Sequence, residues 1–101
     1  MKIRHKFNAK RTECDGITFA SKKEAAYYQE VKIRQRGGMV VFFLRQVPFH
    51  LPGGVKYLAD FVRFDKDGTA HVIDCKGMKT PMYIAKKKMV EALYPIEIEE
   101  V

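Results

Sequence analysis

The stretch from Tyr57 to Lys76 constrains the fold more than any other part of the sequence. It reads YLADFVRFDKDGTAHVIDCK, and the runs Val55–Phe64 and Thr69–Cys75 are rich in β-branched and aromatic residues. Such runs predict strands. The DKDG sequence at 65–68 suits a three-residue hairpin loop, in which a type I turn is followed by a glycine in the left-handed conformation. The stretch therefore predicts an antiparallel hairpin of two largely apolar strands.

The length of this loop decides which side chains share a face. If Asp65 pairs with Thr69, then Asp60 lies directly opposite Asp74, and Lys76 points to the same face. A two-residue loop would place the two aspartates on opposite faces. Two facing carboxylates about 5 Å apart at Cβ repel each other, so we expect a positive group between them. A divalent cation held by oxygen ligands would serve, and so would an ion pair with the basic residues of the surface.

Length and composition favour one globular domain over residues 1–101. The chain has 101 residues, of which 47% are hydrophobic, and a chain of this size can bury a core without disulfides. Cys14 and Cys75 are too few for a disulfide framework and lack metal-ligand spacing, so a reducing cytoplasm is expected. No apolar run approaches the roughly 18 residues of a membrane span, and no signal-peptide pattern is present.

Basic residues outnumber acidic ones. Nineteen Lys and Arg against twelve Asp and Glu give a net charge of +7, which favours a polyanionic partner, although solubility alone can account for such a charge. Basic residues crowd the N-terminus, the first predicted helix and Lys76–Lys88, whereas glutamates collect near the C-terminus. We therefore expect a basic N-terminal arm over about residues 1–15 and a basic face on the domain.

Capping residues and periodicity predict two helices. Ser21 is a good N-cap, and Glu24 completes a capping box at the start of a helix over about Lys22–Arg36. A Thr-Pro pair at 80–81 predicts the start of a second helix, which ends before Pro95. Capping is the simpler role for Glu24. In the first turn the helix dipole also keeps this carboxylate ionised, so it could help to hold a cation.

Further strands are predicted around the hairpin. Ile17–Phe19 is a candidate short strand, and the apolar run Met39–Leu44 predicts a strand buried on both faces. Pro48 restricts Gln46–Leu51 to an edge position, and Ile96–Glu99 alternates as a closing edge strand. The order of these elements predicts an α/β domain, in which a sheet is flanked by two helices.

Glu24, Asp60 and Asp74-Cys75-Lys76 occur in an order that resembles the PD-(D/E)XK nuclease superfamily. There, an acidic residue on the first helix precedes a lone Asp and then a (D/E)-x-K triplet on the next strand of a hairpin. The segments DGITFASKKEA, RQVPF, YLADF and VIDCKG are similar to a small phage-associated subgroup with Holliday-junction-resolvase-like endonucleases, over nearly the whole chain. The resemblance implies a restriction-endonuclease-like mixed sheet whose central hairpin carries the active site. Ala59 replaces the proline of the superfamily name, at a position that varies.

The resemblance implies a metal-dependent DNA endonuclease. Asp60, Asp74 and the backbone carbonyl of Cys75 would bind Mg²⁺, for which Mn²⁺ can substitute. Lys76 would position the attacking water or stabilise negative charge in the transition state, and a counter-ion to the two aspartates is its simpler role. Glu24 would orient the water or help to hold a metal.

The expected substrate is branched DNA, in particular four-way junctions, as in DNA recombination and repair. Symmetric incision of a junction implies a two-fold symmetric homodimer. A non-catalytic nucleic-acid-binding module of the same fold and a nicking or restriction-type nuclease on linear duplex are the alternatives. A phage-encoded protein of this kind would act in the host-cell cytoplasm. Contacts to DNA, mainly to phosphates, are expected from Lys10, Arg11, Lys22, Lys23, Gln46, Lys79, Lys86 and Lys87.

Overall fold

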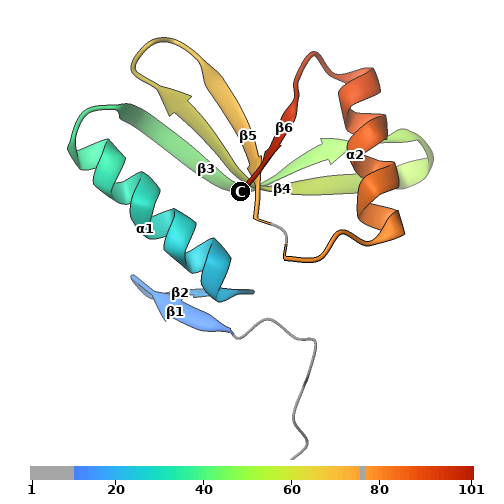
Figure 1. The fold of residues 1–101 in the computed structure, drawn as a ribbon. Helices are drawn as coiled ribbons and strands as arrows, with labels where there is room; N and C mark the ends of the chain where they lie inside the picture. Colours follow the sequence, from blue (N-terminus) through green and yellow to red (C-terminus); the bar gives the residue numbers. More distant parts are fainter. Residues whose placement is uncertain (1–10, 76) are drawn as a thin grey trace, which may run out of the picture.

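The computed structural model describes residues 11–75 and 77–101, which form a small α/β domain (Figure 1). In these residues a four-stranded sheet has the order β3-β4-β5-β6, and only β5 and β6 pair in parallel. No helix in this part of the chain is long and apolar enough to span a membrane. The elements are β1 (Thr12–Cys14), β2 (Ile17–Phe19), α1 (Lys22–Arg36), β3 (Val40–His50), a 3₁₀ turn (Pro52–Gly54), β4 (Lys56–Asp65), β5 (Ala70–Asp74), α2 (Pro81–Leu93) and β6 (Ile98–Glu100).

The N-terminal segment is only partly described. Residues 1–10 of the expected basic arm lie outside the described residues. Thr12–Cys14, which the sequence analysis includes in that arm, forms β1 and pairs with β2. The arm prediction was therefore wrong for these three residues, because a short hairpin with a turn at Asp15-Gly16 carries no strong periodicity over so few positions.

The turn between β4 and β5 is the predicted three-residue loop. The Asp65 N–H donates to the Thr69 carbonyl at 2.9 Å, and the Gly68 N–H donates to the Asp65 carbonyl at 3.0 Å. Gly68 has a φ of +89°, a conformation that glycine adopts without the steric cost of a Cβ. The turn type inferred from the sequence is confirmed.

The register of the hairpin follows from this turn. Phe61 pairs with Ile73, and one further step along the same register would set Asp60 opposite Asp74. Phe61 and Ile73 are fully buried, so the core fixes the same register that the turn selects. The paired residues of this ladder end at Phe61 and Ile73, so the alignment of the two aspartates remains a prediction that this register supports.

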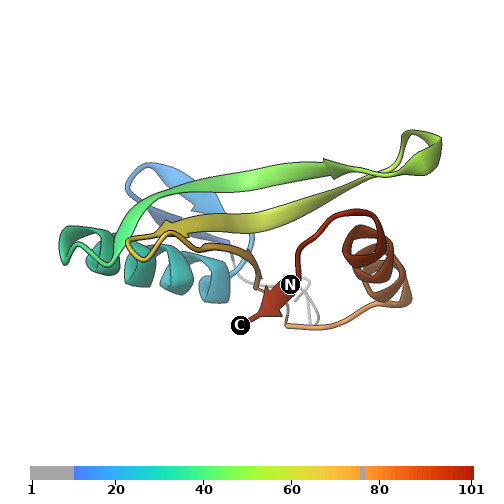
Figure 2. The same cartoon turned by 90° about the horizontal axis from the view of Figure 1, so that it is seen from above.

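Both helices begin and end where the sequence predicts. The Ser21 Oγ accepts a hydrogen bond from the Glu24 N–H at 3.1 Å, and the Thr80 Oγ1 accepts one from the Tyr83 N–H at 3.1 Å. These bonds satisfy N–H groups that have no partner within the first helical turn. The helices lie toward opposite ends of the long β3–β4 hairpin (Figure 2).

The core consists of two clusters, one with each helix. Phe61 belongs to the cluster with α1, whereas Tyr57 and Ala59 belong to the cluster with α2. Val62, on the opposite face of β4 from Phe61, also belongs to the cluster with α2. Asp60 lies between Ala59 of one cluster and Phe61 of the other. On β3 the register places Gln46 opposite Asp60, and Gln46 has a φ of +52°. The seam between the two clusters therefore coincides with Asp60.

The prediction that Met39–Leu44 is a strand buried on both faces was wrong. Val41 and Leu44 are about half exposed, at 59% and 48%, because β3 is an edge strand of the sheet. Phe42 stacks against Phe64 with ring centroids 4.4 Å apart, and this contact covers only part of the exposed apolar surface of β3. The predicted edge position of Gln46–Leu51 is confirmed, and β3 runs through both segments.

Replacing Gly68 tests the turn. No heavy atom lies within 4 Å of a Cβ built at Gly68, so Gly68→Ala acts only through its positive φ and should lower the free energy of unfolding by about 1 kcal/mol. Gly37→Ala is the matched control, because Gly37 has a φ of −80°. Urea denaturation of both variants measures the difference, and equal losses would contradict this account.

Candidate active site

Acidic side chains from α1 and β4 meet beside the end of β5. The Gln46 Nε2 donates to the Glu24 Oε2 at 3.0 Å and to the Asp60 Oδ1 at 3.3 Å. The Asp60 Oδ2 accepts a hydrogen bond from the Cys75 N–H at 2.8 Å, directly after Asp74 in the chain. The structure thus brings Glu24 and Asp60 together through Gln46, while Asp60 reaches the backbone N–H that follows Asp74.

Gln46 has an unusual backbone conformation, with a positive φ. A positive φ is uncommon for a residue other than glycine, and such strained conformations cluster at functional sites. The sequence analysis assigned Gln46 to DNA contacts, with a hydrogen bond at the end of a strand as the alternative. The structure shows hydrogen bonds to two carboxylates from an exposed side chain. This side of the site is open to solvent.

Asp74 is fully buried, and its Oδ2 accepts a hydrogen bond from the Tyr57 hydroxyl. Burial and this hydrogen bond raise the pKa of Tyr57, so the hydroxyl remains a donor to the carboxylate. The sequence analysis missed Tyr57. It lies three positions before Asp60, and its contact with Asp74 is diagonal across the strands, which no local pattern reveals.

The expected repulsion between Asp60 and Asp74 is balanced by donors of the protein itself. The donors are the Tyr57 hydroxyl, the Cys75 N–H and the Gln46 amide. Repulsion alone therefore no longer requires a cation. A carboxylate offers about four lone-pair sites, so Asp60 keeps acceptor capacity beyond its two hydrogen bonds.

Glu24 is buried and crowded by negative charge. Its carboxylate lies 3.5 Å from the Arg45 Nη2, yet its pKa is raised, because burial removes water and Asp60 lies nearby. A cation between Glu24 and Asp60 would lower that pKa. The all-oxygen donor set suits Mg²⁺ or Mn²⁺.

The carboxylates of the described residues are not arranged as a closed metal-binding group. Within residues 11–75 and 77–101, no three His, Cys, Asp or Glu side chains form a group that could hold one. Metal binding by Asp60 and Asp74 would therefore require some rearrangement of the donors contributed by Gln46 and Tyr57. The residue types fit the metal, and the side-chain positions would have to adjust.

Cys14 and Cys75 are free thiols, as expected. Burial, together with the negative charges of Asp60 and Glu24, raises the pKa of the Cys75 thiol to about 12. The thiol therefore stays neutral at physiological pH, and Cys75 contributes to the site through its backbone.

The predicted basic residues are found in different settings. Lys10 and Lys76 lie outside the described residues. Arg11, Lys22 and Lys23 are exposed, and the two lysines stand in the same helical turn as Glu24.

The basic face expected on α2 is partly neutralised. Lys79 and Lys87 lie 2.9 Å and 3.4 Å from carboxylate oxygens of Glu100, and the Lys86 Nζ donates to a backbone carbonyl. Hydrogen bonds from Tyr83 and Lys79 lower the pKa of Glu100 to about 2. The sequence analysis did not foresee this pairing, because Glu100 reaches α2 only through the parallel pairing of β6 with β5.

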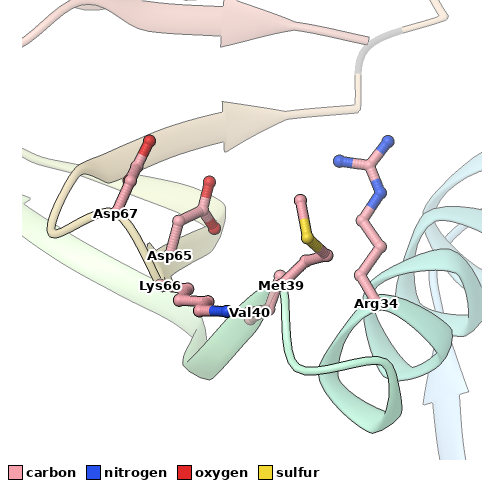
Figure 3. A pocket seen from close by; sticks show the side chains of 6 residues that line it. All are labelled: Arg34, Met39, Val40, Asp65, Lys66 and Asp67. Carbon is pink, nitrogen blue, oxygen red and sulfur yellow. The ribbon is translucent and has the colours of Figure 1, made fainter.

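A second cluster of charge surrounds the β4–β5 turn. The Arg63 guanidinium donates to both oxygens of Asp65 at 2.8 and 3.0 Å, and the His71 Nδ1 lies 2.5 Å from a Glu99 oxygen. A cavity of about 400 Å³ lies beside this cluster (Figure 3). Since the strand rises about 3.3 Å per residue, Asp65 lies roughly 15 Å from Asp60, so this cavity is separate from the candidate site.

Comparison with known proteins finds one match. A family model described as "Protein of unknown function (DUF1064)" matches residues 4–99, which include Glu24, Asp60 and Asp74. No curated protein and no solved structure matches the chain.

Removing the Tyr57 hydroxyl tests whether its hydrogen bond stabilises the buried Asp74 carboxylate. Tyr57→Phe takes one donor from a buried carboxylate, so it should lower the free energy of unfolding by about 1–3 kcal/mol. Tyr83→Phe is the matched control, because the Tyr83 hydroxyl donates to Glu100, which solvent can reach. Chemical denaturation of both variants gives the comparison, and a loss no greater than that of the control would refute the role of Tyr57.

The raised pKa of Glu24 predicts a pH-dependent stability. The pKa of Glu24 in the folded state lies above the ordinary value of 4.5, so the ionised carboxylate disfavours the folded state. The free energy of unfolding therefore falls as pH rises from the ordinary value through the raised pKa. Without divalent ions, Glu24→Gln should therefore unfold at higher denaturant concentration than wild type near neutral pH. The difference should shrink at acidic pH.

Glu30→Gln is the control for this measurement. Glu30 lies on the same helix and forms an exposed ion pair with Arg34 at 2.6 Å, so its loss should lower stability slightly. A Glu24→Gln variant that is less stable than wild type near neutral pH would show that Glu24 is held favourably in its charged form.

Proposed function

We propose that this chain, which belongs to the family described as "Protein of unknown function (DUF1064)", is a metal-dependent DNA endonuclease. One observation carries the proposal: Glu24 and Asp60 share the amide of Gln46, while Asp60 also accepts the N–H that follows Asp74. A helix and two strands of a hairpin would thus supply acidic residues to one site, in the order that the PD-(D/E)XK resemblance implies.

The chemistry of the donors supports a hard divalent cation. Asp60, Asp74 and the Cys75 carbonyl would hold Mg²⁺, or Mn²⁺ in its place, through oxygen atoms. When bound, such an ion polarises a phosphodiester and lowers the pKa of a coordinated water. Asp60 is only half-buried beside the exposed Gln46, so a phosphate can approach from that side.

The remaining residues would orient the reactants. Glu24, held through its Oε2 by Gln46, would accept a hydrogen bond from the attacking water. For Lys76, outside the described residues, we propose stabilisation of negative charge on the phosphate. Lys22 and Lys23, exposed in the same helical turn as Glu24, would bind neighbouring phosphates of the DNA backbone.

We further propose branched DNA, in particular four-way junctions, as the substrate, with a two-fold symmetric homodimer as the active form. Cutting both strands of a junction symmetrically needs two sites related by such an axis. The net charge of +7 supports a polyanionic partner.

A non-catalytic DNA-binding module is the second candidate. The observation that favours it is the hydrogen-bond network itself, in which both oxygens of Asp60 and one of Asp74 already accept donors of the protein. Donors of the protein itself can hold buried carboxylates in place without an ion. Such a module would bind DNA with an affinity that falls steeply with salt, and it would not cut.

Cleavage of synthetic DNA with Mg²⁺ tests the proposal. The wild-type protein should cut a four-way junction, and Asp60→Asn and Asp74→Asn should each lower the rate by at least about 100-fold. Glu97→Gln, an exposed acidic residue outside the site, is the control and should cut like wild type. Gel analysis of a junction, a flap, a linear duplex and a single strand gives the rates.

The possible results of this cleavage experiment distinguish between the proposed functions. Retardation of DNA without any cutting would favour the binding module. Equal cutting of linear duplex and junction would identify a nicking or restriction-type nuclease. Full activity of Asp74→Asn would remove Asp74 from the mechanism.

A further inference from the structure

A second cavity adjoins the candidate site. It has a volume of about 400 Å³, within the range of small-ligand pockets, and lies between β4 and the first turn of α2. Tyr57 connects it to the site, because its ring lines the cavity while its hydroxyl donates to Asp74. The cavity is lined by Lys56, Tyr57, Leu58, Thr80, Met82, Tyr83 and Lys86.

Aromatic and apolar residues form part of the lining of this cavity. Tyr57 and Tyr83 are buried, with ring centroids 6.3 Å apart. Leu58 and Met82 also line the cavity and are 44% and 65% exposed, so a ligand can reach them from solvent. Unpaired bases are held between apolar or aromatic side chains, and the flexible thioether of methionine adapts to such a guest.

The charge of this cavity favours an anion. Lys56 and Lys86 line it, and the Lys86 Nζ donates to the Lys56 carbonyl at 3.3 Å, which keeps that ammonium group near the rim. Among the described residues that line it, none is acidic. The cavity of Figure 3 differs, because two carboxylates, Asp65 and Asp67, share it with basic residues.

We propose that this cavity binds one unpaired nucleotide of the DNA substrate, with the base against Leu58 and Met82 at the opening and a phosphate against Lys56 and Lys86. The inference rests on the proposed function and narrows its branched substrates to those with an unpaired nucleotide at the branch point, such as a flap or an incompletely paired junction. Because Tyr57 lines the cavity and donates to Asp74, a nucleotide held there lies next to the candidate site. Fully paired linear DNA offers no such nucleotide.

A fluorescent base tests the proposal without cleavage. A flap oligonucleotide carries 2-aminopurine as its first unpaired base, and binding is titrated in EDTA. The fluorescence of 2-aminopurine should change on binding to the flap and stay constant when the same base is paired in a linear duplex. Leu58→Ala and Met82→Ala should each weaken flap binding at least about fivefold, with little effect on the duplex.

Matched variants on the same helix provide the controls. Leu93→Ala removes a side chain of α2 that is 56% exposed and does not line the cavity, so flap binding should not change. Lys86→Gln should weaken the flap more than the duplex, whereas Lys88→Gln, an exposed lysine outside the cavity, should affect both equally. Thermal unfolding checks that each variant is folded.

The outcomes distinguish this inference from the proposed function. If Leu58→Ala and Met82→Ala weaken flap binding no more than Leu93→Ala, the cavity does not bind the nucleotide, even if the wild-type protein cuts DNA. If the fluorescence and the variants behave as expected but Mg²⁺ produces no cleavage, the nucleotide site stands and the nuclease proposal fails.

Discussion

The hydrogen bond from the Asp65 N–H to the Thr69 carbonyl closes the β4–β5 turn, and the rest of the structure depends on the register that it sets. With this register Phe61 and Ile73 face the core together, and Asp60 reaches the N–H of Cys75. A slip of one residue would turn every side chain of the strand to the opposite face. The same change would expose the core and separate the residues of the candidate site, so the fold and the candidate site depend on the same strand register.

The site lies where two parts of the core meet, and its residues are costly to hold. Glu24 is buried with a raised pKa, Asp74 is fully buried, and Gln46 has a positive φ. Each of these features lowers stability unless the neighbouring groups compensate. The compensation is visible in the hydrogen bonds that Gln46, Tyr57 and the Cys75 N–H donate. Features of this kind together are typical of sites kept for chemistry rather than for packing.

Local signals made much of the fold predictable. Ser21 and Thr80 mark the starts of both helices, and Gly68 identifies the turn, because capping and left-handed positions restrict the residue type directly. Contacts between distant segments were not predictable in the same way. The exposure of Leu44 depends on which strand forms the edge of the sheet, and the pairing of Lys79 with Glu100 depends on β6. Of the site, Glu24, Gln46 and Asp60 come together, and the bound metal and the cleavage reaction remain predictions.

The strand β3 has a further consequence for how this protein meets other chains. An exposed edge strand offers unpaired backbone groups to any added strand. Along β3 this template is interrupted, since Gln46 leaves the extended conformation and Pro48 lacks an N–H. The register with β4 also shifts between Val40 and Phe42, so regular pairing continues only from Phe42 to Arg45, beside the exposed side chains of Val41 and Phe42. Edge-to-edge aggregation would start in that short segment, and a charged residue in place of Val41 would be the most direct way to improve solubility.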